Sequence, residues 1–324
     1  MLPNKKHSAD LTEQADHAND EVAEILSGLR SPQKSISPKY FYDERGSRLF
    51  DQICQLPEYY PTRTEIGIME EFAGEMADCI GPHASLIEFG SGSSLKIRIL
   101  LRHTDRLAAY VPVDISREHL VASAEATAKE FPAIEVLPVA ADFTRPFSLP
   151  NPKTMPVRNI VYFPGSTIGN FSPEGALELL GVMFHEAGQG GGLLIGIDLQ
   201  KESATLERAY NDASGVTAEF NLNVLRRLNR EFGATFDLAA FRHRAIYNEI
   251  DGRIEMYLVS LRDQSFRVAG QAFEIARGES ILTEHSHKYT LDGFAAMAAA
   301  AGFRLEQHWT DRDRLFAVCY CSRD

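Results

Sequence analysis

Short apolar runs alternate with amphipathic stretches through the middle of the chain. The apolar runs predict buried strands at residues 85–90, 109–114, 133–142, 157–166 and 192–199. Between them, residues 94–103, 119–131 and 173–187 carry apolar side chains at helical spacing. Because parallel strands need crossovers of this kind, the pattern predicts an α/β fold with a doubly wound, Rossmann-like parallel sheet.

This pattern is interrupted at about residue 199. Residues 204–233 are mostly of helical type, and residues 241–261 predict a hairpin that turns at Asp251-Gly252. A helix at 291–303 and strands at 304–309 and 314–321 then resume the sheet. Upstream of the sheet, the segment from Pro38 to Glu65 is rich in aromatic residues, and Glu65 to Asp78 has the spacing of an amphipathic helix.

We therefore expect a second, smaller α+β lobe built from two separate segments. The expected division is a flexible tail at 1–20, the first part of this lobe at 21–80, the main sheet at 81–198, an insertion completing the lobe at 199–285, and the last part of the sheet at 286–324.

Charge narrows the classes of partner. With 33 basic and 45 acidic side chains, the chain has a net charge of −12, which repels phosphate backbones, so no nucleic acid partner is expected. No apolar run approaches the roughly 20 residues needed to span a bilayer, and the polar start resembles no signal peptide. We expect a cytoplasmic monomer with no membrane partner, acting on a small molecule.

The glycine-rich turn after the first expected strand is a candidate cofactor site. Glu88 and Phe89 lead into Gly90, Ser91 and Gly92, and glycines at this turn allow a ligand to approach the backbone. A dinucleotide-binding turn requires a third small residue at the start of the helix, where this chain has Leu95. The acidic residue two positions before Gly90 is more typical of a methyltransferase.

Two further acidic positions follow neighbouring strands. Asp114 ends the second strand, where a carboxylate can accept from two ribose hydroxyls. Asp142 and Phe143 end the third, where a carboxylate can meet an adenine amine and a ring can stack on the base. Each acid alone could be a helix cap or a solvated turn, but three such features in one βαβαβ unit favour a nucleotide-type cofactor.

Metal binding is not expected. His285 and His287 share one face of an apolar segment, but no third ligand has suitable spacing. Cys319 and Cys321 likewise share a face of the last strand, and we interpret all four cysteines as free thiols.

Several longer motifs resemble the histidine Nα-methyltransferases of ergothioneine biosynthesis. They are PKYFYDERGSRLFDQI, LPEYYPTRTE, EFGSGSSLKIRILL, YVPVDIS, FPGSTIGNF, AYNDASGVTAEFNLNVL and TEHSHKY, and the resemblance runs from about Pro38 to the C-terminus. It departs at Phe89, Ile97 and Pro164, none of which removes a polar ligand. The resemblance implies a class I methyltransferase domain with a substrate-binding lobe, and conversion of free L-histidine to trimethylhistidine (hercynine) with S-adenosylmethionine and without a metal.

The resemblance also implies roles for individual residues. Gly90, Lys96, Asp114, Asp142 and Phe143 would bind S-adenosylmethionine. Asn170 and Tyr210 would bind the substrate carboxylate, and Tyr59 and Glu284 its imidazole. Tyr42, Phe50, Gly165 and Thr217 would surround the amine, with Met256 and Ser286 completing the side-chain pocket. Since no strong base is among the residues around the amine, its proton would pass either to Tyr42, directly or through water, or to the solvent.

Three other functions remain open at this point. The chain could methylate another amino acid or an indole amine such as tryptophan. It could be a nicotinamide-dependent oxidoreductase, although Leu95 disfavours this, or a binding module without catalysis, although the complete set of polar positions disfavours that.

Overall fold

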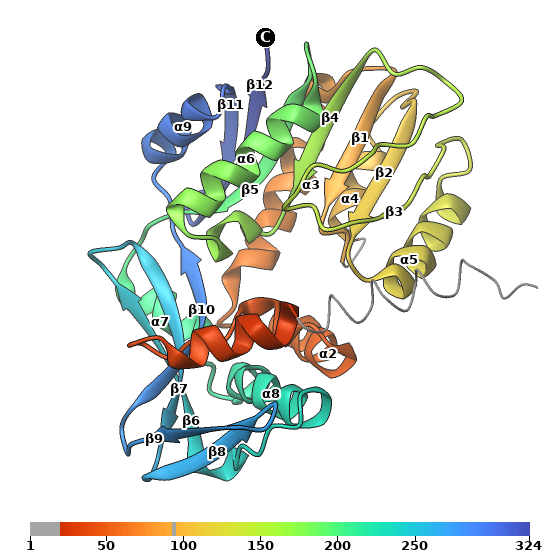
Figure 1. Cartoon of the computed structure of the whole chain (residues 1–324). Helices are drawn as coiled ribbons and strands as arrows, with labels where there is room; N and C mark the ends of the chain where they lie inside the picture. Colours follow the sequence, from red (N-terminus) through yellow and green to blue (C-terminus); the bar gives the residue numbers. More distant parts are fainter. Residues whose placement is uncertain (1–19, 93–94) are drawn as a thin grey trace, which may run out of the picture. The chain divides into compact units, whose positions relative to one another are not determined.

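The structure is a computed structural model that describes residues 20–92 and 95–324 (Figure 1). The tail expected at 1–20 therefore lies almost entirely outside the described residues. The described chain forms two compact units. One consists of residues 20–59, Ser203–Glu249 and Ile254–His285, and the other of Tyr60–Glu202, Ile250–Arg253 and Ser286–Asp324.

The second unit contains a seven-stranded sheet in the order β11-β12-β5-β4-β1-β2-β3. Its strands are β1 (Ala84–Phe89), β2 (Ala109–Asp114), β3 (Val139–Ala140), β4 (Arg158–Phe163), β5 (Gly192–Asp198), β11 (Arg304–Thr310) and β12 (Phe316–Ser322). Strands β1 to β5 pair in parallel, whereas β12 is antiparallel to β5 and β11. The doubly wound Rossmann-like fold is thus confirmed, and the strand order reverses between β1 and β4, where such folds bind ligands.

Helices cover both faces of this sheet (Figure 1). On one face pack α3 (Tyr60–Ile80) and α4 (Leu95–Leu101), and on the other α6 (Pro173–Ala187) and α9 (Leu291–Ala300). Helix α5 (Arg117–Glu130) follows β2. Neighbouring residues of the central strands enter opposite cores, as Leu86 and Ile87 of β1 do, so these strands carry apolar side chains on both faces.

Two elements of this unit differ from the sequence prediction. The strand expected at 133–142 pairs with β2 only at Val139 and Ala140, besides one isolated bridge at Val136. It lies at the sheet edge and contains Pro138, which has no N–H to donate. Helix α3 also begins earlier than expected, at Tyr60 rather than Glu65.

The first unit combines helices with two small antiparallel sheets. Residues 20–30 are helical, followed by η1 (Pro38–Phe41), α2 (Glu44–Ile53), α7 (Ser203–Tyr210), α8 (Val216–Glu231) and η3 (Leu238–Ala240). The expected hairpin forms from β6 (Phe241–Asn248) and β7 (Arg253–Ser260), and β10 (Ser280–His287) pairs with β7. A second hairpin, β8 (Gln264–Val268) and β9 (Gln271–Ile275), goes beyond the sequence prediction.

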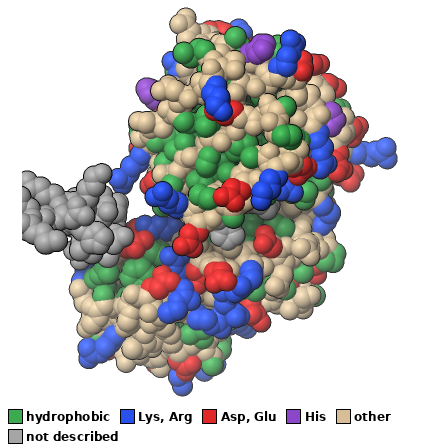
Figure 2. Space-filling view, turned by 90° about the vertical axis from the view of Figure 1, so that its right-hand side faces the viewer, with side chains coloured by type: hydrophobic (Ala, Val, Ile, Leu, Met, Phe, Trp, Pro, Cys, Tyr) green, Lys and Arg blue, Asp and Glu red, His purple; other side chains and the backbone are tan. Residues whose placement is uncertain are grey.

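Charged side chains of both signs are scattered among hydrophobic and uncharged polar ones on the surface drawn in Figure 2. Lysine and arginine side chains lie among aspartate and glutamate side chains on this face, rather than forming one basic stripe. Within the described ranges, no helix combines the length and the apolar character that crossing a bilayer requires.

Candidate active site

The glycine turn after β1 lies against the end of β2. Gly90 has a left-handed backbone (φ 71°), and its N–H and that of Ser91 donate to the carbonyl of Val113, at 2.9 and 3.2 Å. A Cβ atom at position 90 would lie 3.6 Å from the ring of Phe143. The turn and Phe143 therefore lie together at the carboxyl edge of the sheet.

Asp114 and Asp142 project from the same edge. The backbone N–H of Ser116 donates to Asp114 Oδ1 (2.8 Å), and Thr144 donates to Asp142 Oδ1 through its N–H (3.0 Å) and its hydroxyl (2.6 Å). These contacts orient both carboxylates. Phe143 packs on Phe89 with ring centroids 5.5 Å apart.

Ser91 provides an independent indication of a ligand at this turn. Its side chain is buried, but among the residues that the structure describes its hydroxyl has no hydrogen-bond partner. Buried polar groups normally have a partner. A polar ligand at the glycine turn would supply one, and S-adenosylmethionine fits this set of donors and acceptors.

Glu65 also lies at this edge of the sheet, although it is not among the site residues predicted from the sequence. Its buried carboxylate accepts from the N–H of Gly165, at 2.9 and 3.0 Å, and pairs with the ammonium of Lys96. Lys96 therefore supports the loop after β4, which also contains Asn170 in the short helix η2 (Thr167–Asn170). The glycine-rich FPGSTIGNF motif predicts this loop from the sequence. Nothing in the motif indicates that Glu65, 100 residues earlier in the chain, is its acidic partner.

Several aromatic rings form a cluster in the other unit. Phe50 lies 5.8 Å from Tyr42 and 6.3 Å from Tyr59, between ring centroids, and Tyr59 lies 6.0 Å from Tyr210. Phe220, on α8, contacts both Tyr42 and Phe50. The structure thus brings together four predicted residues from separate segments. The sequence prediction misses Phe220, although it is three residues after Thr217 and so on the same helical face.

The carboxylate of Glu284 influences this cluster. Burial raises the pKa of the Tyr59 phenol well above its ordinary value, with smaller contributions from Tyr210, Cys54 and Glu284. The pKa of Tyr42 is also raised, mainly by burial of its hydroxyl and secondly by the charge of Glu284. The residue as a whole is 44% exposed. Both side chains are therefore neutral phenols at physiological pH.

A buried polar network supports the residues around this cluster. Asn221 accepts from the hydroxyl of Thr283 (2.7 Å) and contacts His243 Nδ1 (2.9 Å), and His243 Nε2 donates to the carbonyl of Tyr210 (2.8 Å). The Thr283 hydroxyl oxygen also lies 3.1 Å from the carbonyl oxygen of Met256. Burial lowers the pKa of His243, which favours the neutral ring that this arrangement requires.

Hydrogen bonds at the start of α8 hold Thr217, another predicted site residue, in place. Asp212 accepts from the N–H of Val216 (2.9 Å) and from that of Thr217 (2.8 Å), and Thr217 is buried. These bonds satisfy two donors that a helix N-terminus leaves free.

Comparison with known proteins identifies the family. A family model described as "Histidine-specific methyltransferase, SAM-dependent" matches residues 21–323. The chain belongs to this family. It is 43% identical over 305 residues to a histidine N-alpha-methyltransferase of Mycolicibacterium smegmatis (91% of this chain, 94% of the relative). It is 41% identical over 306 residues to that of Mycobacterium tuberculosis (93% and 94%).

A longer fungal relative matches the same region. The chain is 33% identical over 300 residues to "Ergothioneine biosynthesis protein 1" of Neurospora crassa, covering 89% of this chain and 33% of that protein. Family membership confirms an S-adenosylmethionine-dependent transferase and excludes the nicotinamide-dependent alternative. Among the described residues, no group of three or more His, Cys, Asp or Glu side chains is placed to bind a metal.

The predicted site residues of this methyltransferase fall in both units. Gly90, Lys96, Asp114, Asp142, Phe143, Gly165, Asn170 and Ser286 belong to the sheet unit, and Tyr42, Phe50, Tyr59, Tyr210, Thr217, Met256 and Glu284 to the other. Their individual roles remain predictions.

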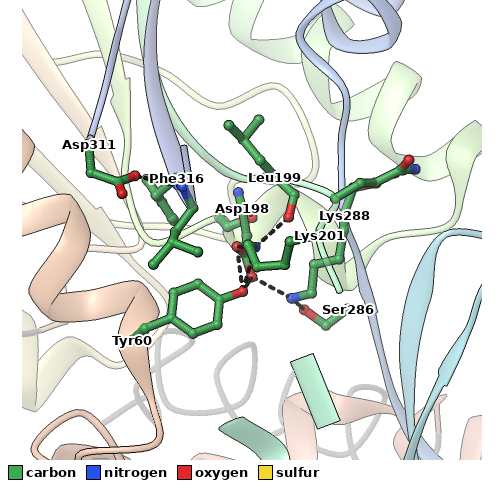
Figure 3. Close-up of polar contacts among 11 residues, drawn as sticks. Tyr60, Asp198, Leu199, Lys201, Ser286, Lys288, Asp311 and Phe316 are labelled. Atoms are coloured by element: carbon green, nitrogen blue, oxygen red, sulfur yellow. Dashed lines mark hydrogen bonds and ion pairs between the residues drawn. The ribbon is translucent and has the colours of Figure 1, made fainter. Parts of the chain in front are cut away.

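The sheet unit also contains a buried charged cluster that the sequence does not reveal. At the end of β5, Asp198 contacts Tyr60, Lys201 and Lys288, and Lys288 reaches Ser286 (Figure 3). Tyr60 and Lys288 are each close in sequence to a residue predicted to bind the substrate ring, Tyr59 and Ser286.

Proposed function

We propose that this methyltransferase converts free L-histidine to hercynine by three successive methylations of the α-amino group, the first step of ergothioneine biosynthesis. The observation that carries this proposal is the buried carboxylate of Glu284, whose charge acts on the phenols of Tyr42 and Tyr59 in the aromatic cluster. A carboxylate can accept a hydrogen bond from an imidazole N–H, and a phenol hydroxyl can donate one to the second ring nitrogen. Glu284 and Tyr59 would therefore recognise histidine, with Met256 and Ser286 completing the pocket.

Other residues would orient the α-carbon. The amide of Asn170 and the phenol of Tyr210 can donate to the free carboxylate of the substrate. Tyr42, Phe50, Gly165 and Thr217 would surround the amine. S-adenosylmethionine supplies a methyl group on a positively charged sulfur, and Gly90, Lys96, Asp114, Asp142 and Phe143 would bind it.

Catalysis in this proposal depends mainly on alignment. Methyl transfer requires the nitrogen lone pair to point along the breaking S–C bond, and such positioning contributes up to about 7–11 kcal/mol. The amine must lose a proton before each transfer. Because the pKa of Tyr42 is raised, its phenol would orient the amine, and the proton would pass to solvent. Aromatic faces also stabilise the quaternary product by roughly 0.5–2 kcal/mol.

Mass spectrometry tests this function directly. The protein is incubated with S-adenosylmethionine and a mixture of free amino acids, together with a histidine-containing peptide. Histidine is expected to gain up to three methyl groups on its α-nitrogen and the peptide none, because an acylated nitrogen has no available lone pair. Methyl groups on the ring nitrogens, or preferential labelling of tryptophan, would contradict the proposal. We also propose that the protein acts as a monomer in the cytoplasm and binds neither nucleic acid nor a membrane.

A further inference from the structure

Asp198 lies at the carboxyl end of β5 among the side chains of Tyr60, Lys201 and Lys288, of which only Lys201 is partly exposed (Figure 3). The Tyr60 hydroxyl lies 2.7 and 2.8 Å from its two carboxylate oxygens. Lys201 Nζ lies 2.6 Å from Oδ1, and Lys288 Nζ lies 2.8 Å from Oδ2. One carboxylate therefore pairs with two ammonium groups.

The two lysines differ in what else they contact. Lys201 also donates to the Tyr60 hydroxyl (2.6 Å) and to the carbonyl of Leu199. Lys288 donates instead to the hydroxyl oxygen of Ser286 (2.8 Å). A lysine ammonium has only donors, so Ser286 must accept in this bond. Lys288 thus connects the cluster to a residue predicted to contact the substrate ring.

Burial makes this connection rigid. The side chains of Asp198 and Lys288 are each 1% exposed. The backbone around Lys288 is fixed as well, since its N–H donates to Gly252 O (2.8 Å) and the N–H of Tyr289 donates to Asp198 O (2.9 Å). Although burial alone raises the pKa of Asp198, Lys288 and then Lys201 lower it overall, so the carboxylate is ionised and anchors the ammonium.

We propose that Lys288, anchored on Asp198, is a positioning residue that fixes the hydroxyl of Ser286 for binding of the histidine ring. A free serine side chain samples three rotamers, and a charge-assisted bond to a buried ammonium selects one of them. Pre-orientation of this kind improves binding because less freedom is lost when the ligand arrives. This inference rests on the proposed function, because it assigns a partner to a residue of that pocket.

The matched variants are Lys288→Met and Lys201→Met. Each leaves Asp198 with one ammonium, so the buried carboxylate keeps a counter-charge in both, and only Lys288→Met removes the contact with Ser286. Calorimetry on the full chain with S-adenosylhomocysteine present measures the Kd for histidine. Lys288→Met is expected to raise it about tenfold, as loss of one charged hydrogen bond does, whereas Lys201→Met should change it less than about twofold.

Two further measurements separate positioning from general damage. The Kd for S-adenosylmethionine should be unchanged in Lys288→Met. Ser286→Ala should weaken histidine binding to a similar degree, and adding Lys288→Met to it should cost little more, because both changes act through one contact.

The outcomes distinguish the two proposals. Additive losses in the double variant, or equal losses in Lys201→Met and Lys288→Met, would overturn the positioning role while histidine binding by the wild type stands. If the wild type binds no histidine, the proposed function fails and this inference fails with it. If Lys288→Met does not fold, Lys288→Leu, which likewise has no donor for Ser286, takes its place in the same cycle.

Discussion

Asp114 ends β2 next to Val113, the residue whose carbonyl accepts from the glycine turn. In the proposed site Asp114 accepts from two ribose hydroxyls of the cofactor, so Asp114→Ala would remove this charged acceptor, and such bonds contribute roughly 1.5–3 kcal/mol. We expect the affinity for S-adenosylmethionine to fall about tenfold or more, measured by calorimetry. Asp105→Ala, an exposed aspartate before β2, is the control and should bind normally. Unchanged affinity in a folded Asp114→Ala variant would mean that the cofactor lies elsewhere.

Glu284 permits a second test at the residue scale. Glu284→Ala should lower kcat/KM for histidine roughly ten- to hundredfold, because in the proposed pocket the ring N–H would lose a buried acceptor worth about 1.5–3 kcal/mol. The relative rate with tryptophan or phenylalanine should rise, since these rings no longer leave a carboxylate unpaired. Adding Met256→Val should enlarge the pocket and favour tryptophan further.

Glu279 provides the control for this test. It precedes β10 and pairs with Lys34, so Glu279→Ala should keep the wild-type preference. Kinetics with the three amino acids decide the matter. If Glu284→Ala retains the preference for histidine, this carboxylate plays no part in selecting the substrate.

Within β5, Gly196 leaves the space that Glu65 of α3 occupies. A Cβ atom there would lie 2.3 Å from Glu65 Oε1 and 3.0 Å from the ring of Phe316, both in the packed core. Gly196→Ala should therefore lower the free energy of unfolding by about 1–3 kcal/mol, as overpacking does, and displace Glu65 from the N–H of Gly165.

The matched control is Gly181→Ala on the exposed side of α6. A Cβ atom at position 181 would come within 4 Å of no described residue beyond its own helical turns, and alanine favours a helix by about 1 kcal/mol over glycine. Thermal unfolding should show a lower Tm for Gly196→Ala and an equal or higher Tm for Gly181→Ala. Equal behaviour of the two variants would mean that α3 can move away from β5 without cost.

The stability of the whole molecule should depend on pH through Glu88. Burial raises the pKa of this carboxyl to about 8, despite the hydrogen bond that Tyr110 donates to it. Between the ordinary pKa of glutamate and pH 8, the folded chain therefore keeps a proton on Glu88 that the unfolded chain has lost. The contribution of protonated Glu88 to the free energy of unfolding is complete at low pH. It is lost as pH rises through this window, at up to about 1.4 kcal/mol per pH unit.

Chemical denaturation between pH 5 and 8 measures this effect. In Glu88→Gln the free energy of unfolding should fall less with rising pH than in the wild type, because the amide cannot ionise. The exposed Glu118→Gln variant should follow the wild type. Parallel curves for all three proteins would show that Glu88 ionises as easily in the folded as in the unfolded chain.

Much of the sheet unit can be predicted from local pattern. Apolar runs separated by helical segments specify parallel strands, and the ends of such strands meet at one edge. Strand order along the chain is therefore enough to place Gly90, Asp114 and Phe143 together. The pattern fails at β3, where apolar residues at 133–142 predict a full strand. Only the assembled sheet decides which strand lies at an edge, and pairing there stops where Pro138 provides no donor.

The sequence by itself determined the order of elements in the sheet unit, the strand ends that carry polar residues and, through its long motifs, the resemblance to histidine methyltransferases. Tertiary structure alone decided that Phe220 joins the aromatic cluster, that Glu65 supports the Gly165 loop, and that Tyr60, Asp198 and Lys288 meet. The reason is physical. Periodicity records which face of an element is buried, but a partner distant in sequence is selected only when two elements pack.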